Sequence, residues 1–400
     1  MDILGKFRRI TTNQLYLPEI DGMRFLSLSL VTLFHIRGYF LEKTTIKFTD
    51  NPAGYTVLNR FFINFDRSVP LFFAISGFIL CVPFAHHYIN HGKKINLKQY
   101  YIRRVTRLEP PYFIVMTCIF LAQLALGIYT FPTLFPHLLA SLGYSHNLIY
   151  HETPWVTVVA WTLEVEIQYY IIAPLLFRLL VFPKAVRRSL ISVLIILFVM
   201  LQYYYPPTFL SLYGSIQHFL IGILIADFYV SGVAIDLFKK WFMAPLALGV
   251  LLFMFYMPRW DFTTTPQLHL QIYAILLPFL IGLLYYIILR NEAVKKVFSW
   301  KFIPVIGGMC YTTYLIHYTI ISMLGKYTVR VHFTNYFIPN LLLQFVLLII
   351  PILLVAAVFF LYIERPFMSK KWVDKLMGRD KHKETANLQS EVPSEATPGK

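Results

Sequence analysis

Charged residues are scarce in this sequence: 14% of its 400 residues are Asp, Glu, Lys or Arg, whereas 57% are hydrophobic and 17% aromatic. A soluble globular domain is about a quarter charged. Because apolar runs recur along the whole chain, the sequence excludes a soluble domain behind a single leader and predicts an integral membrane protein. Residues 1–10 are basic and lack a small-residue cleavage site, so we expect them to be retained.

Cysteine is also rare. Cys81, Cys118 and Cys310 are far apart and each falls within an apolar run. We therefore expect them to be packing residues, and we expect neither a disulfide framework nor a zinc cluster from them.

Ten apolar runs are long enough to cross a bilayer as helices. The sequence therefore predicts an all-α polytopic protein, with spans over residues 22–41, 66–85, 110–129, 158–180, 189–205, 211–230, 241–258, 269–289, 305–324 and 341–363.

Basic residues alternate between the connecting segments in a way that fits these ten spans. The net charge is +16, and most Lys and Arg fall in every second loop, which is the pattern of cytoplasmic loops. Both ends are then cytoplasmic, and the charge sets topology instead of binding nucleic acid. We expect a cytoplasmic N-terminus over 1–21, a membrane domain over 22–366 and a cytoplasmic, partly disordered tail over 367–400.

One predicted outer loop, residues 130–157, contains no Lys or Arg. It is long enough to fold over the outer mouth. It contains His137, His146, His151 and Glu152, whose side chains are of types that bind metals. Their loose spacing favours solvated loop residues, so we expect no metal site from them.

Arg24 and His35 lie in the first apolar run, within LPEIDGMRFLSLSLVTLFHIRGYF. Eleven residues are almost three helical turns, so both side chains share one face, about 16 Å apart along the axis. Ionisable groups in lipid-spanning helices normally face a protein interior or a wet cavity. His35 suits a general base, and Asp21 is placed to orient Arg24. The alternative is a structural polar pair between helices.

Glu164 and Glu166 lie in WTLEVEIQYY of the fourth run. Two helical positions separate them by about 200°, so they cannot both face one cavity. We expect one, Glu166, to serve the site in the layer of His35, where a hydrogen bond would fix the imidazole. The alternative is a hydrogen bond that pairs two helices.

Three arginines, Arg103, Arg104 and Arg107, occur in YYIRRVTRLEPPY, directly before the predicted third span. Arg104 and Arg107 share a face if this stretch is helical. Guanidinium groups suit phosphates, so the sequence indicates an anionic ligand at the inner face. The positive-inside rule alone is the competing explanation.

Further polar residues lie inside the predicted helices. Ser76 and Gly77 allow close helix approach, and Tyr311, Tyr314 and His317 form a stripe at three-residue spacing. Glu364 and Arg365 close the last run and are expected to be structural or neighbours of the basic site. Candidate cavity-lining residues are thus Ser76, Tyr314 and His317.

Six motifs taken together resemble the acyltransferase family 3 membrane proteins, which transfer acyl groups to hydroxyls of surface glycans and other extracytoplasmic molecules. The resemblance runs from about residue 18 to 366. The motifs follow in the family's order: IDGMRFLSLSLVTLFH, LFFAISGFIL, RRVTRLEPPY, WTLEVEIQYY, YTTYLIH and ERP. Pro70 stands where many members have an aspartate before the LFF motif, and some members add a C-terminal esterase-like domain where this sequence has a short polar tail.

The resemblance implies an acyl-CoA donor, commonly acetyl-CoA, that acts as a co-substrate without a permanently bound cofactor. It implies catalytic roles for His35 and Arg24, the family's glutamate at Glu166, and donor binding by Arg104 and Arg107, to which the residue analysis adds Arg103.

The sequence as a whole predicts a membrane O-acyltransferase in the bacterial inner or plasma membrane, in contact with lipid and with a glycan or other hydroxyl-bearing acceptor. His35 acts either as a general base or as a transient acyl carrier. The alternative function is a transporter or flippase that uses the same polar path without covalent chemistry.

Overall fold

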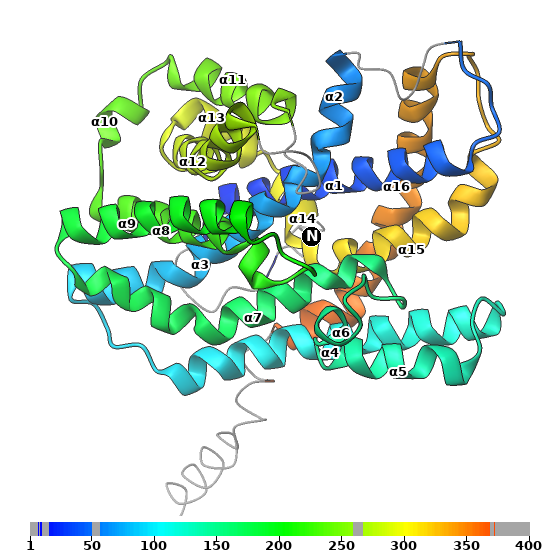
Figure 1. Cartoon of the computed structure of the whole chain (residues 1–400), viewed down its shortest axis with the longest axis horizontal. Coiled ribbons are helices and arrows are strands. Elements are labelled where there is room, and N and C mark those ends of the chain that lie inside the picture. Colours follow the sequence, from blue (N-terminus) through cyan, green and yellow to red (C-terminus); the bar gives the residue numbers. More distant parts are fainter. Residues whose placement is uncertain are drawn as a thin grey trace, which may run out of the picture.

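The protein is described by a computed structural model that covers residues 16–49, 57–258 and 267–368, together with residues 7, 9 and 372. Helices form all the regular structure in these ranges, as predicted (Figure 1). The first half contains α1 (Pro18–Lys43), α2 (Val57–Ile63), α3 (Ser68–Asn90), α4 (Leu97–Ala125), α5 (Phe131–Leu142), α6 (His146–Tyr150), α7 (Trp161–Leu176) and α8 (Lys184–Tyr204). The second half contains α9 (Ile216–Ser231), α10 (Ile235–Phe238), α11 (Met243–Tyr256), α12 (Leu268–Arg290), α13 (Glu292–Phe298), α14 (Ile303–Gly308), α15 (Cys310–Thr328), α16 (Phe337–Phe359) and α17 (Arg365–Phe367).

Each of the ten predicted apolar runs lies on one helix or on consecutive helices. In the described ranges, five helical stretches are long and apolar enough to cross a membrane: Val57–Asn90, Leu97–Ala125, Lys184–Tyr204, Leu268–Arg290 and Phe337–Phe367. The apolar helices α5, α9 and α11 are shorter. These lengths fit a membrane-embedded protein. The count of ten spans and the orientation of the ends stay predictions, and the predicted disordered tail lies outside the described residues.

Helix α1 holds a central position and contacts α3, α13, α14, α15 and α16. In Figure 1 it runs behind the junction between the left and right groups of helices. Pro18 occupies the first turn, where its missing N–H costs nothing, and Glu19 and Asp21 place negative charge at the positive end of the helix dipole. The residues of α1 are thus surrounded by protein on several sides.

Two close helix contacts depend on glycine. A Cβ atom on Gly307 of α14 would lie 1.7 Å from the backbone oxygen of Asp21 in α1. On the other side of the molecule, a Cβ on Gly77 of α3 would lie 2.3 Å from the backbone oxygen of Phe219 in α9. No side chain fits at either distance, so these glycines permit backbones to touch, as predicted for Gly77.

Helix α4 begins earlier than the sequence indicated. The predicted third span started at residue 110, after a basic loop, but the helix runs from Leu97 to Ala125 and includes Pro110 and Pro111. The side chain of Asn96 caps it by accepting a hydrogen bond from the Gln99 N–H at 3.0 Å. The three arginines therefore project from the first turns of a helix.

The predicted outer loop 130–157 is also more ordered than expected. It contains the apolar helix α5 and the short helix α6. The backbone N–H and the side-chain amide of Asn147 both donate to Glu164 Oε2, each at 2.9 Å, which joins this segment to α7. Glu164 thus faces the loop segment, as the 200° separation from Glu166 predicts.

Replacement of Gly307 by alanine tests the contact between α1 and α14. Because the new Cβ collides with backbone, we expect Gly307→Ala to lower the free energy of unfolding by about 1–3 kcal/mol, measured from thermal unfolding in detergent. The matched control is Gly249→Ala in α11, where a Cβ meets nothing within 4 Å. The control should be neutral or stabilising, because alanine favours helix. Equal responses of the two variants would contradict the close contact.

Candidate functional site

Two adjoining cavities lie between α1, α3 and α4. The smaller holds about 150 Å³ and is lined also by α7, α15 and the π-helical turn Phe360–Glu364 after α16. The larger holds about 940 Å³. Both walls include Arg9, Arg24, Ile79, Leu80, Arg104 and Arg107. The two cavities thus adjoin and share four arginines in their walls.

The larger cavity is strongly basic. Its wall contains seven lysine or arginine side chains, which are Arg9, Arg24, Lys93, Lys94, Arg103, Arg104 and Arg107, and a single carboxylate, Asp21. Such a concentration of positive charge in a concave surface attracts and holds polyanions. The predicted basic site is therefore present as a cavity, with all three predicted arginines in its wall.

The arginines of α4 are distinguished by their lack of carboxylate partners. Within the described residues, Arg103, Arg104 and Arg107 form no ion pair. By contrast, Arg187 and Arg188 both bind the buried Asp227. Guanidinium groups that line a cavity without a partner are available to a ligand anion.

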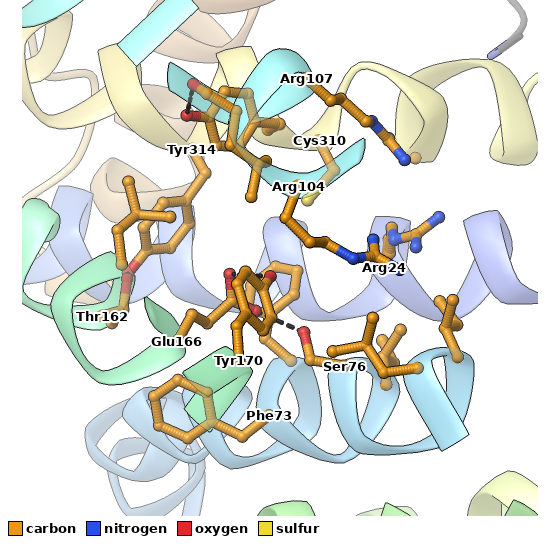
Figure 2. A pocket seen from close by; sticks show the side chains of 18 of the residues that line it. Arg24, Phe73, Ser76, Arg104, Arg107, Thr162, Glu166, Tyr170, Cys310 and Tyr314 are labelled. Carbon is orange, nitrogen blue, oxygen red and sulfur yellow. Dashed lines mark hydrogen bonds between the residues drawn. The ribbon is translucent and has the colours of Figure 1, made fainter. Parts of the chain in front are cut away.

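Arg104 is nevertheless held in place by aromatic rings. Its guanidinium carbon lies 5.7 Å from the ring centre of Tyr100 and 5.9 Å from that of Tyr170. Cation–π contacts at these distances orient the guanidinium group without neutralising it. Figure 2 shows Arg104 and Arg24 extending into the same space.

Arg24 pairs with Asp21, one turn earlier on α1, as the sequence predicted. Asp21 is 3% exposed and also lies 3.5 Å from Nη1 of Arg9. One buried carboxylate thus positions two guanidinium groups in the cavity wall. The pair leaves Arg24 with further N–H groups to donate, because guanidinium has five.

Glu166 forms the opposite wall of the smaller cavity. Its Oε1 accepts a hydrogen bond from the Ser76 hydroxyl, and its Oε2 accepts one from the Tyr170 hydroxyl at 2.9 Å (Figure 2). The prediction that Glu166 bonds His35 was therefore wrong, because the partners of the carboxylate are Ser76 and Tyr170 in the wall of the smaller cavity, which His35 does not line. The prediction compared only the depths of Glu166 and His35 in the membrane, counted in residues along each helix. In the structure α7 packs against α3, so the Glu166 carboxylate lies beside Ser76 in the same cavity wall as Arg24.

Other lining residues were only partly anticipated. Ser76 and Tyr314 line the smaller cavity as predicted, and Tyr314 accepts a hydrogen bond from Thr162 at 3.0 Å. Tyr170 was not predicted as a lining residue. Its position four residues after Glu166 puts both side chains on one helix face and could have indicated it. Glu364, 2% exposed, also lines the wall and accepts from both N–H and hydroxyl of Thr312.

His35 lies on α1 beyond the walls of both cavities. Its half-buried imidazole packs against the rings of His317, Tyr318 and Phe34, with centroid distances of 5.2, 5.1 and 5.3 Å. About 16 Å of helix axis separates Arg24 from His35. The site thus has two parts on one helix: a basic cavity around Arg24 and an aromatic and imidazole group around His35.

His317 belongs to this second part, so its prediction as a cavity-lining residue was wrong. It is fully buried, and its Nδ1 lies 2.6 Å from the Tyr314 backbone oxygen. Because a carbonyl only accepts, Nδ1 carries the proton and Nε2 holds a free lone pair. That Nε2 is buried without a hydrogen-bond partner in the described part of the chain. It is available to orient His35 or receive its proton.

The histidines of segment 130–157 are not the solvated residues that the sequence indicated. His137 is 8% exposed and His146 is fully buried. Burial lowers the pKa of both imidazoles from the ordinary histidine value. Only His151 and Glu152 are exposed as predicted.

Comparison with known proteins agrees with these features. Residues 17–361 match the acyltransferase domain family. Over 182 residues the chain is 25% identical to peptidoglycan O-acetyltransferase OatA from Listeria monocytogenes serovar 1/2a (strain ATCC BAA-679 / EGD-e). This match covers 43% of the chain and about a quarter of that relative, 25% of its length. No solved structure matches the chain. Because the match to the domain spans residues 17–361 of 400, the protein belongs to the acyltransferase family 3.

Proposed function

We propose that the protein is a membrane O-acyltransferase that moves an acyl group, acetyl in the simplest case, from cytoplasmic acyl-CoA to a hydroxyl of an extracytoplasmic glycan. The observation that carries the proposal is the set of unpaired arginines in a large basic cavity, built around the same helix that holds His35. A protein that only moved a neutral solute would gain nothing from this charge.

The donor's phosphates are assigned to the larger cavity. Arg103, Arg104 and Arg107 form no ion pair within the described residues and offer guanidinium forks to phosphates, and Lys93 and Lys94 add charge. A cavity of about 940 Å³ is within the usual size range of small-molecule and cofactor sites. The pantetheine arm then enters the smaller chamber, where apolar residues such as Phe72 and Ile79 alternate with polar ones.

Transfer takes place at His35 in this proposal. The imidazole removes the proton of the acceptor hydroxyl, whose oxygen attacks the thioester carbonyl. The C–S bond breaks, and the imidazolium returns the proton to the CoA sulfur. The ring of His317 packs against His35, and its Nε2 lone pair is available to accept the His35 N–H during transfer, whereas Glu166 and Arg24 belong to the donor chamber. The competing route forms an acyl-histidine before the acceptor is acylated.

The face of the membrane follows from charge. With the basic α3–α4 connection in the cytoplasm, both chain ends are cytoplasmic and His35 lies toward the outer side. The Listeria relative is a peptidoglycan O-acetyltransferase, and peptidoglycan is a glycan, which supports an acceptor of this class. A bacterial inner membrane fits this arrangement.

Removal of the α4 guanidinium groups tests donor binding. We expect Arg104→Ala and Arg107→Ala each to weaken binding of acetyl-CoA by about tenfold or more, because each loses charge-assisted hydrogen bonds. Equilibrium binding of radiolabelled acetyl-CoA to protein in detergent measures the change. Arg178→Ala is the matched control, since Arg178 is exposed and lies outside both cavity walls. Unchanged affinity in both α4 variants would contradict the donor site.

Substitution of His35 separates chemistry from donor binding. We expect His35→Ala to slow acetyl transfer by at least about 100-fold while the affinity for acetyl-CoA changes little, because His35 is not in the cavity walls. Transfer is followed with labelled acetyl-CoA and a panel of glycan acceptors. Retained transfer in this variant would rule out the catalytic role of His35. If the unaltered protein moves an acceptor glycan across a membrane but yields no labelled product, the function is that of a transporter.

The route through His35 is tested without acceptor. If His35 is a general base, protein mixed with labelled acetyl-CoA and quenched within milliseconds carries no covalent label. Label that appears in the unaltered protein and is absent from His35→Ala would contradict the base mechanism and establish the acyl-histidine.

A further inference from the structure

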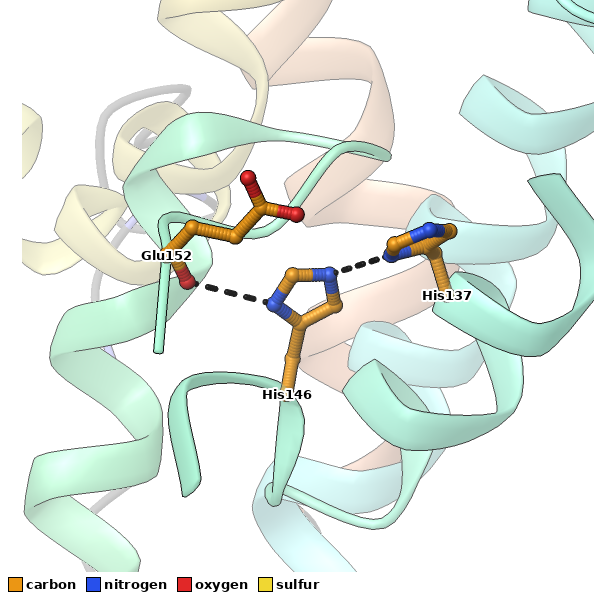
Figure 3. Close-up of side chains that lie close together, drawn as sticks. All are labelled: His137, His146 and Glu152. Carbon is orange, nitrogen blue, oxygen red and sulfur yellow. Dashed lines mark hydrogen bonds between the residues drawn. The ribbon is translucent and has the colours of Figure 1, made fainter. Parts of the chain in front are cut away.

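Segment 130–157 contains a second cluster of polar side chains, which do not line either of the two cavities. His137, His146 and Glu152 each offer one atom that could bind a metal, and these three atoms lie within 4.8 Å of one another (Figure 3). The histidines come from α5 and α6, and Glu152 follows α6. Nothing in the proposed transfer reaction uses these residues.

The ring of His137 is fixed by aromatic stacking. It lies between Trp155, with centroids 3.9 Å apart and planes at 10°, and Tyr150, at 4.2 Å and 29°. Stacking on both faces leaves only the ring edge free to bind, and that edge presents Nδ1 to His146. A ligand atom held by packing in this way is already oriented for a metal.

The proton positions of His146 follow from its neighbours. Its Nδ1 lies 3.3 Å from the backbone oxygen of Glu152, which can only accept, so Nδ1 carries the proton. Its Nε2 therefore presents a lone pair toward His137. An imidazole that donates one N–H to a carbonyl and points the other nitrogen at the metal is the usual arrangement of ligating histidines.

The distance between the two nitrogens is close to the distance between two imidazole nitrogens that bind the same metal ion. Without metal, His137 Nδ1 and His146 Nε2 share a proton at 2.8 Å. Two imidazoles on tetrahedral zinc, with Zn–N of about 2.0–2.1 Å, place their nitrogens about 3.3 Å apart. An opening of about half an ångström thus suffices, and His137 then carries its proton on Nε2.

We propose that His137, His146 and Glu152 bind a divalent transition-metal ion, Zn²⁺ in the first place. Two neutral imidazoles and one carboxylate favour zinc over Mg²⁺ or Ca²⁺, which prefer oxygen ligands. Figure 3 shows the Glu152 side chain extending toward the two histidine rings, with its carboxylate nearer to His146 in this view. Its exposed position leaves room for water as the fourth ligand.

The site draws its ligands from three parts of segment 130–157, namely α5, α6 and the chain that follows α6. The ion connects α5 to the chain after α6, next to the place where Asn147 bonds Glu164 of α7. Binding to the folded state alone stabilises that state by mass action. The metal therefore acts as a structural clamp of segment 130–157.

Titration with Co²⁺ and Zn²⁺ tests the site. Full-length protein with a tag free of histidine is stripped with chelator in detergent and titrated with Co²⁺, whose visible absorption reports tetrahedral ligation. We expect one Co²⁺ per chain, displacement by Zn²⁺ and a higher unfolding temperature with either ion. Glu152→Gln should weaken Co²⁺ binding by more than about tenfold, because even the loss of a residue that only supports a metal ligand weakens metal binding by about this factor.

Matched variants decide whether these residues are the ligands. His146→Ala should abolish the Co²⁺ spectrum, whereas His151→Ala, an exposed histidine of the same segment, should keep it. Glu152→Gln changes an exposed side chain and is expected to fold, so it remains informative if His146→Ala does not. No stoichiometric Co²⁺ in the unaltered protein, or equal binding in Glu152→Gln and His151→Ala, would overturn the proposal.

Discussion

The arrangement of the basic cavity depends on the ion pair between Asp21 and Arg24 in the first turns of α1. A charged group on a helix in lipid must find partners inside the protein, because hydrocarbon offers none. Asp21 meets this constraint by accepting from Arg24 while its backbone oxygen lies against Gly307 of α14. That contact brings α14 and α15 onto α1, and with them the polar stripe of α15 that completes both parts of the site.

The arginines of α8 form ion pairs with a buried carboxylate, whereas the arginines of α4 do not within the described residues. Arg187 and Arg188 neutralise the buried Asp227 and hold α8 to α9. The arginines of α4 form no ion pair within the described residues and line the basic cavity, where Arg104 packs against the rings of Tyr100 and Tyr170. A concave surface with this much positive charge attracts anions, and this property is the basis of the proposed donor site.

The sequence predicted the helical class, the ten apolar runs, the Asp21–Arg24 pair and the shared face of Arg104 and Arg107, because these depend on spacing within one helix. It misplaced Glu166, His317 and the histidines of α5 and α6, because these depend on how separate helices meet. Depth along a span does not specify which helix is adjacent. Thus Glu166 turned out to bond Ser76 and Tyr170, and His137 stacks on Trp155, eighteen positions later.

In the proposed function an acyl group passes along α1 from the basic cavity to His35, so that donor and acceptor are used on opposite faces of the membrane. Proteoliposomes that enclose a soluble glycan acceptor and receive acetyl-labelled CoA only from outside test it directly, in the fraction whose α3–α4 connection faces outward. We predict labelled acceptor inside the vesicles and free CoA outside. Labelled product confined to the donor side, with acceptor supplied there, would contradict the account.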